Sequence, residues 1–226
     1  MPLSHYNFYG RTCIGVYLRA TDRFVICPES TMDNDVRLFA DTFRVDTIIK
    51  TTVYKSDLIG IFTIANSNGI ILPQLIDDSE LERIRANLPR DTRMAILPSR
   101  WTAIGNFLLV NDSGCLSGLR LSRDQVKIIS DTLDIEVEVG SIENLPYIGS
   151  LAVATNKGVL VDPMISSEEE QVIRDVLKVP VYKGTVNYGS RIVKIGVVAN
   201  SYGLIVSDTT RGSELARITE AFHVEE

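Results

Sequence analysis

The sequence predicts an α/β protein built from five repeats of about 45 residues, and three series of residues indicate it. An Ile-Gly pair recurs as Ile14-Gly15, Ile59-Gly60, Ile104-Gly105, Ile148-Gly149 and Ile195-Gly196. A second and a third series are each spaced by 45, 45, 44 and 45 residues: Phe24, Gly69, Gly114, Gly158 and Gly203, and Phe43, Leu88, Leu133, Leu177 and Phe222. Periods of this length are typical of solenoids, propellers and other repeat arrays.

The repeats fill the 226 residues from end to end, so we predict one domain over residues 1–226. Its repeats span approximately residues 11–55, 56–100, 101–144, 145–190, and 191–226 together with 1–10.

The second repeat illustrates the predicted unit. The apolar run 58–65 predicts a buried strand, and the turn 66–69 leads into a second short strand that ends at Pro73. In that turn, Gly69 is expected to supply a positive φ. A helix capped by Asp77, Asp78 or Ser79 follows, and a third strand is expected around residues 92–96.

The other repeats follow the same order. In the fourth, residues 148–154 and 159–161 predict strands, Ser166 or Ser167 caps a helix, and residues 179–181 predict the third strand. The third and fifth helices are expected to begin near Ser122 and Ser213.

The first and last repeats are each incomplete, and together they make one unit. The chain begins with a short aromatic segment, residues 6–9, that reads as a strand without a preceding helix. If this strand completes the last repeat, no sheet edge stays open. We therefore predict a closed ring of five pseudo-symmetric strand-strand-helix-strand repeats. An open solenoid is the alternative, but it would need polar capping repeats, which the sequence does not contain.

Composition limits the classes of partner and of site. With 23 basic and 29 acidic side chains the net charge is −6, which disfavours non-specific nucleic-acid binding and suits a basic protein partner. Cys13, Cys27 and Cys115 lack the spacing of a zinc site and are expected to be reduced thiols in a cytoplasmic protein. No signal peptide, membrane span, metal or cofactor is predicted.

Several stretches in register along the chain resemble the translation initiation factor 6 family, in its archaeal form. They include residues 78–81 with 87–89, 103–106, 131–133, 179–181, 184–190 and 208–210. The resemblance covers essentially the whole chain and implies the pentein fold, an α/β propeller with five repeats.

The resemblance also implies a function without catalysis. Members of the family bind the large ribosomal subunit and block its association with the small subunit. They contact a ribosomal protein beside the sarcin–ricin loop. They are released with the help of the Shwachman–Bodian–Diamond protein and a translational GTPase. Closed ring geometry favours a monomer.

One position differs from its counterparts in the other repeats. The repeat glycine is followed by Val16, Ile61, Asn106, Ser150 and Val197, and only Asn106 carries an amide. The alternatives are that Asn106 pairs with nearby backbone or that it faces a partner protein. The resemblance favours the partner, because it implies that the matching residue contacts the large subunit.

The resemblance implies further contacts at Leu58, Ile61, Asp112 and Ile192. Core packing for the three apolar residues, and turn chemistry for Asp112, are the alternatives. Asn187, Tyr188 and Arg191 lie in a glycine-flanked connection, and Tyr and Arg are frequent interface anchors. Trp101 is expected to be a packing residue.

There are two alternative functions. The pentein fold also occurs in guanidine-modifying enzymes, which use a late nucleophilic Cys after a His. Here no Cys follows Cys115, and His223 is expected to be a cation at a helix C-terminus. A ring-shaped interaction module with another partner is the second alternative, since a fold alone does not define a function.

Overall fold

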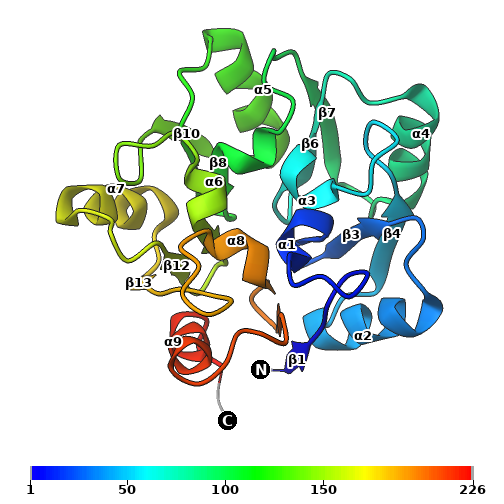
Figure 1. Ribbon diagram of the computed structural model, residues 1–226. Coiled ribbons are helices and arrows are strands. Elements are labelled where there is room, and N and C mark those ends of the chain that lie inside the picture. The colour runs from blue at the N-terminus through cyan, green and yellow to red at the C-terminus, as the bar shows by residue number, and fades with distance from the viewer. Residues whose placement is uncertain (1, 225–226) are drawn as a thin grey trace.

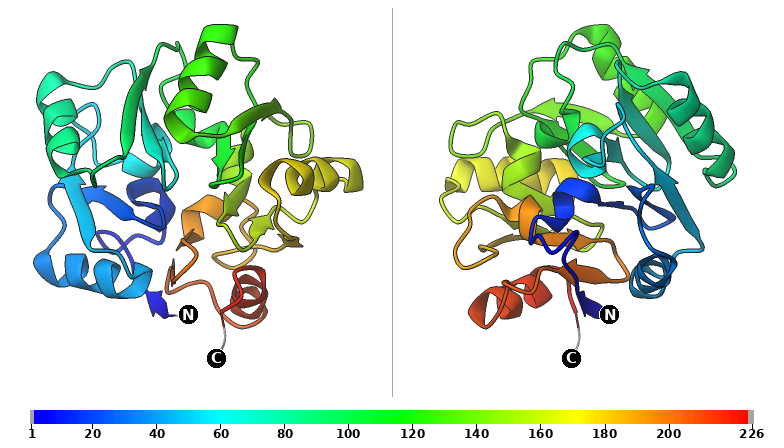
Figure 2. Two further views of the ribbon diagram at one scale, coloured as in Figure 1. Left: turned by 180° about the vertical axis from the view of Figure 1, so that it is seen from behind. Right: turned by 45° about the vertical axis from the view of Figure 1, so that its right-hand side comes forward.

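The computed structural model describes residues 2–224 and has a mixed α/β architecture (Figure 1). Within these residues the strands form five sheets of three strands, one sheet per repeat. In each sheet the first and second strands are antiparallel, and the second and third are parallel. The long helices lie at the outside of the molecule, as Figure 2 also shows from behind.

The strands are short and recur in the same order. The first strands are β2 (Arg19–Ala20), β5 (Ile64–Ala65), β8 (Leu108–Val110), β11 (Ala152–Ala154) and β14 (Val197–Ala199). The second strands are β3 (Phe24–Pro28), β6 (Gly69–Pro73), β9 (Gly114–Ser117), β12 (Val159–Val161) and β15 (Leu204–Val206). The third strands are β4 (Thr47–Thr51), β7 (Arg93–Leu97), β10 (Glu136–Val139), β13 (Val181–Lys183) and β1 (Leu3–His5).

The N-terminal strand completes the last sheet, as predicted, but from different residues. Strand β1 pairs in parallel with β15, with Leu3 opposite Leu204 and His5 opposite Val206. Residues 6–9, which the sequence suggested as the strand, instead lead into a tight turn closed by a bridge between Phe8 and Arg11. The aromatic ring of Phe8 is buried there in the core.

A long helix follows the second strand of each repeat, and in the first four repeats it leads to the third strand. These helices are α2 (Asp33–Phe43), α4 (Asp78–Asn87), α5 (Arg123–Leu133), α7 (Ser167–Leu177) and α9 (Ser213–Ala221). Asp77, Ser122 and Ser166 cap α4, α5 and α7 in full capping boxes, whereas Gly212 precedes α9. The third strand of the fourth repeat begins two residues later than predicted, at Val181.

The predicted first strand of each repeat was wrong in its first half. A short helix replaces it: α1 (Ile14–Tyr17), α3 (Ile59–Phe62), η1 (Ile104–Asn106), α6 (Ile148–Leu151) and α8 (Val193–Gly196). Each short helix contacts the next, in the order α1, α3, η1, α6, α8, and α8 contacts α1. Because these helices are largely buried against one another, their sequence is mostly apolar, and an apolar run does not distinguish a buried helix from a buried strand.

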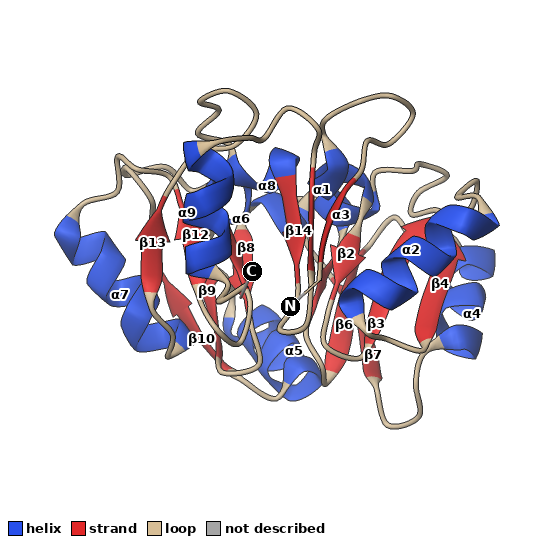
Figure 3. Ribbon diagram, turned by 90° about the horizontal axis from the view of Figure 1, so that it is seen from below, coloured by secondary structure: helices blue, strands red, loops and turns tan. Residues whose placement is uncertain are grey.

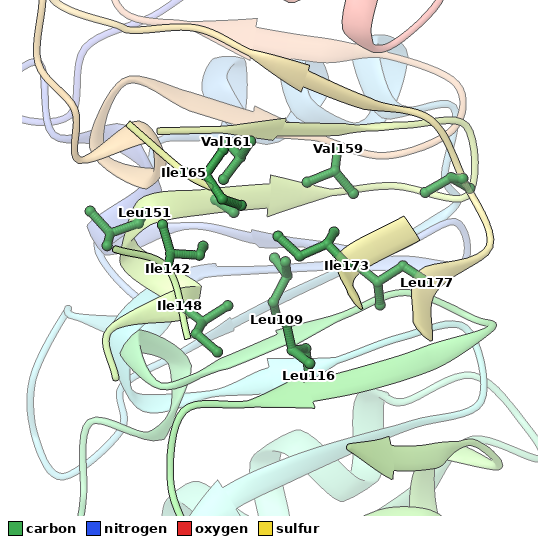
Figure 4. Close-up of a cluster of buried hydrophobic side chains, with 12 residues drawn as sticks. Leu109, Leu116, Ile142, Ile148, Leu151, Val159, Val161, Ile165, Ile173 and Leu177 are labelled. Carbon is green, nitrogen blue, oxygen red and sulfur yellow. The ribbon is translucent and has the colours of Figure 1, made fainter. Parts of the chain in front are cut away.

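The buried side chains form five clusters, and each cluster joins two consecutive repeats. In Figure 4, Ile173 and Leu177 of α7 lie against Leu109 and Leu116 of the preceding repeat and Val159 of their own. Another cluster packs Val198 and Ile205 of the last repeat with Phe39 and Phe43 of the first. No repeat therefore has a core of its own.

The second glycine series serves close approach and not the positive φ that was expected. A Cβ on Gly203 would lie 1.7 Å from the carbonyl oxygen of Thr42, and a Cβ on Gly158 would lie 2.0 Å from that of Ala221. Both carbonyls belong to the last turn of the long helix of the following repeat. Any side chain at these positions would push neighbouring repeats apart.

The first series is also a packing series, and its last member was assigned two residues too late. Gly15, Gly60, Gly105 and Gly149 are the second residues of their short helices, and that place in α8 belongs to Lys194. A Cβ on Gly60 would lie 2.1 Å from the oxygen of Gly15. Ile195, and not Val197, is consequently the counterpart of Asn106.

The close approach at Gly203 generates a stability prediction. Replacing Gly203 by Ala should lower the free energy of unfolding by about 3 kcal/mol or more, the upper range of overpacking costs, because the obstacle is backbone. Gly140→Ala is the matched control, since its Cβ would meet only the end of the Leu116 side chain. Urea denaturation of both variants checks this, and equal losses would contradict the role assigned to Gly203.

Candidate functional site

Tight turns precede most of the short helices and share a side of the molecule with them. Antiparallel bridges close these turns at Phe8–Arg11, Val53–Ser56, Ile142–Leu145 and Val186–Ser190. We call these turns and the five short helices together the turn face. In Figure 3 the short helices α1, α3, α6 and α8 lie toward one edge of the molecule. The hairpin turns after the first strands lie at the other end of those strands.

The turns hold exposed aromatic side chains on strained backbone. Tyr9, Tyr54 and Tyr188 all have positive φ, between 51° and 61°, and their residues are 54%, 56% and 78% exposed. Positive φ is unfavourable for residues other than Gly. Each Tyr lies six positions before the second residue of its short helix, a regularity that sequence reasoning missed and that the repeat spacing could have revealed.

Carboxylates on the long helices hold these turns in place. Glu80 accepts hydrogen bonds from the backbone N–H groups of Tyr54 and Lys55 and from the hydroxyl of Thr52. Glu169 binds the turn at Glu143 and Asn144 in the same way, and Glu214 binds the N–H groups of Tyr188 and Gly189. Three of the four turns, at Tyr54, Glu143 and Tyr188, are thereby fixed by the long helix that follows them in the chain.

These hydrogen bonds set the protonation of the carboxylates. Burial acts to raise the pKa of Glu80, but the hydrogen bonds from Thr52 and from the backbone outweigh it and lower that pKa. The pKa of Glu169 is lowered by the same balance, with the N–H of Asn144 and the hydroxyl of Ser141 foremost. At neutral pH both Glu carboxylates are therefore ionised and can accept the hydrogen bonds of the turns.

Seven of the eight proposed contact residues lie on the turn face. Leu58 and Ile192 cap the starts of α3 and α8, and Ile61 lies within α3. Asn106 is the last residue of η1. Asn187 and Tyr188 lie in the turn before α8, and Arg191 directly follows that turn.

Asn106 has a free amide. Its residue is partly exposed, and among the described residues its side chain forms no hydrogen bond. By contrast, the buried Asn111 donates to the oxygens of Thr155 and Leu177 and accepts from the N–H groups of Ser113 and Gly114. The structure thus does not pair Asn106 with nearby backbone, which was the alternative to a partner contact.

The other polar residues of the set are mostly engaged within the protein. The side-chain oxygen of Asn187 accepts from Ser207, Thr209 and Thr210. Arg191 binds the fully buried carboxylate of Asp162, with its Nη2 2.8 Å from Oδ2. Of the three residues, Tyr188 is the most exposed, whereas the side chains of Asn187 and Arg191 are engaged in these contacts within the protein.

Asp112 lies apart from the other seven. It is in the hairpin turn after β8, where its carboxylate accepts from Ser67 N at 2.8 Å and from Asn156 Nδ2 at 2.7 Å. Asn156 also binds Asp22. The contacts of Asp112 tie its hairpin turn to those of the repeats before and after it, and the bond from Asn156 to Asp22 reaches the first repeat. They give Asp112 a structural role within a turn.

Comparison with known proteins identifies the family. The model of the eIF-6 family matches residues 3–221. The chain belongs to this family. It is 42% identical over 225 residues to translation initiation factor 6 of Thermococcus kodakarensis, covering 98% of each chain. It is 41% identical over 217 residues to translation initiation factor 6 of Aeropyrum pernix, covering 95% of this chain and 92% of the other.

These relatives are named initiation factors and not enzymes. The two buried thiols, Cys27 and Cys115, also lack the properties of a nucleophile. Burial raises the pKa of Cys115 to about 12, whereas a catalytic thiol needs a lowered pKa. Among residues 2–224 there is no group of His, Cys, Asp and Glu side chains that could hold a metal ion, and no helix has the length and apolar character needed to cross a membrane.

The carboxylate clamps generate a pH-dependent prediction. Because the folded pKa of Glu80 is depressed, its stabilisation is present above its unfolded pKa of about 4.3 and is lost as pH falls through the folded value. Glu80→Gln should lower the unfolding free energy by about 1–3 kcal/mol at pH 7, with a smaller difference from wild type at pH 3. Denaturation at both pH values tests this. The exposed Glu82→Gln on the same helix is the control, and an equal response of the two variants would contradict the clamp.

The two asparagines generate a second prediction. Asn111→Ala should cost about 2–3 kcal/mol of unfolding free energy because it leaves buried backbone groups unpaired. Asn106→Ala should change stability by less than about 0.5 kcal/mol. Urea titrations measure both, and a large loss for Asn106→Ala would show that this residue is structural.

Proposed function

We propose that the protein binds the large ribosomal subunit through the turn face and prevents the small subunit from joining. The names of its relatives support a role in translation initiation. The observation that points to the turn face is the free amide of Asn106 on a face whose turns also carry exposed Tyr side chains. The bound protein blocks subunit joining sterically and is later released in a regulated step, and it performs no catalysis.

The same proposal extends to the fold and the partners. Five sheets, the pairing of β1 with β15, and the cyclic contacts of the short helices support a closed pentein-type ring with pseudo-fivefold symmetry. We infer a cytoplasmic monomer without a cofactor that contacts a ribosomal protein beside the sarcin–ricin loop. The Shwachman–Bodian–Diamond protein and a translational GTPase release it, in subunit biogenesis or in the control of initiation.

The chemistry of the turn face fits such a partner. Tyr side chains supply large contact area at low entropic cost and are enriched in interface hot spots. The Glu clamps keep the turns in one conformation, so little ordering is needed on binding. The net charge of −6 favours a basic protein surface over bare RNA.

A sedimentation assay tests the function. The purified protein is mixed with archaeal large subunits, small subunits are added at a magnesium concentration that favours joining, and the mixture is separated on a sucrose gradient. Wild type should migrate with large subunits and reduce the joined peak. If it stays at the top of the gradient, the proposal fails and a module with another partner becomes the better account.

Two variants test the surface. Asn106→Arg should weaken binding at least about thirty-fold, a loss of about 2 kcal/mol, with little change in melting temperature. The control is Tyr202→Arg, an exposed residue in a hairpin turn at the other end of the strands, which should bind normally. Equal weakening by both variants, or normal binding by Asn106→Arg, would contradict the turn face.

A further inference from the structure

A small cavity lies at the centre of the molecule, between the short helices and the first strands. Its volume is about 50 Å³. A water molecule needs about 10–15 Å³ on such a measure, so the cavity has room for a few water-sized species. Residues at one repeat position form its floor: Ala20, Ala65, Val110, Ala154 and Ala199. The same five residues also border a second cavity of about 30 Å³ on the hairpin side.

Two cationic side chains line the central cavity. Lys194 occupies the helix position that Gly holds in the other four repeats and is only 6% exposed. Its Nζ lies 2.6 Å from the carbonyl oxygen of Gly105, in a repeat that is not adjacent in the chain. Nη2 of Arg19 donates to the oxygens of Gly60 and Thr63, and it would lie 3.0 Å from a Cβ on Gly105. Both cations therefore converge on Gly105.

Some of the hydrogen-bond donors of these two side chains have no acceptor among the described residues. Nε of Arg19 is buried and has no hydrogen-bond partner among the described residues. One of the three Lys194 donors has a partner in the same residues. A buried donor without an acceptor lowers the stability of the folded state, so an acceptor for these donors is expected.

The two charges are not compensated by the protein. Within residues 2–224 the cavity wall contains no Asp or Glu, and neither cation forms an ion pair. A buried charge is expensive unless it is paired. In agreement, burial and the charge of Arg19 hold the pKa of Lys194 well below its usual value, and burial lowers the pKa of Arg19 to about 10.

We propose that the central cavity binds a small inorganic anion, such as chloride, between Arg19 and Lys194. The anion accepts hydrogen bonds from Nε of Arg19 and Nζ of Lys194 and compensates their charge. The cavity volume limits the ligand to a small ion and excludes a nucleotide or a peptide carboxylate with its chain. The competing account is a neutral Lys194 that hydrogen-bonds only to Gly105 and water.

Bromide makes the site visible. Crystals of the full chain soaked in sodium bromide are measured at the bromine absorption edge. The expected result is an anomalous peak within hydrogen-bonding distance of Arg19 Nε and Lys194 Nζ. Density for water alone, without an anomalous peak, overturns the proposal.

Melting curves test the same site in solution. At constant ionic strength, replacing gluconate by chloride should raise the melting temperature of wild type by about 3–6 °C once chloride reaches roughly ten times its dissociation constant. Lys194→Met should abolish this dependence whatever its own stability, and the exposed Lys157→Met should retain it. Lys194→Gly, which restores the residue of the other repeats, should also lose it. A dependence that survives in both Lys194 variants, or is missing in wild type, refutes the anion site.

Discussion

Backbone contact between consecutive repeats is the constraint on which the rest of the structure depends. At two levels the main chain of one repeat lies against that of a neighbour with no space for a Cβ: where short helices meet at Gly60 and Gly105, and where the hairpin strand meets the end of a long helix at Gly158 and Gly203. Because each apolar cluster is shared between two repeats, these contacts also decide whether the cores form. A repeat on its own would expose apolar side chains that its neighbours cover, so the stability of each repeat depends on its neighbours.

Side chains at the hairpin turns add hydrogen bonds to this contact between consecutive repeats. Asn66, Asn111 and Asn200 each donate to the carbonyl that ends the long helix of the next repeat, and each donates as well to the matching turn. The bond from Asn200 to Phe43 runs from the last repeat to the first. The first repeat departs from the pattern: Phe24 replaces the glycine, α4 ends in extended backbone at Leu88, and Arg23 instead binds the oxygen of Arg90. The Asn residues thus occur where the neighbouring long helix offers its last carbonyl, and the first repeat, whose neighbouring helix ends differently, uses Arg23 instead.

The sequence was sufficient for the repeat, the order of the long helices and the completion of the last sheet, because these depend on spacing and apolar pattern. It was insufficient for the short helices, since burial on all sides makes helix and strand alike in composition. The register at Lys194 was missed because an Ile-Gly pair two residues later imitates the series. For the candidate site, the resemblance pointed to Asn106, which stays a prediction. The hydrogen-bond partners of Asn187, Arg191 and Asp112 are residues twenty or more positions away, which no local pattern contains. The Tyr series was available from spacing alone.

Interior and surface meet at Gly105. This glycine accepts the bond from Lys194, has the guanidinium of Arg19 beside it, and immediately precedes Asn106. The helical turn η1 has three residues, whereas the other short helices have four, and it is the one that presents an amide. Since its backbone is held from inside by the two cations and from the side by Gly60 and Gly149, Asn106 cannot shift without moving the centre of the molecule. Such rigidity would favour the binding that we propose for this surface, because a contact residue that is already ordered loses less conformational entropy when a partner binds.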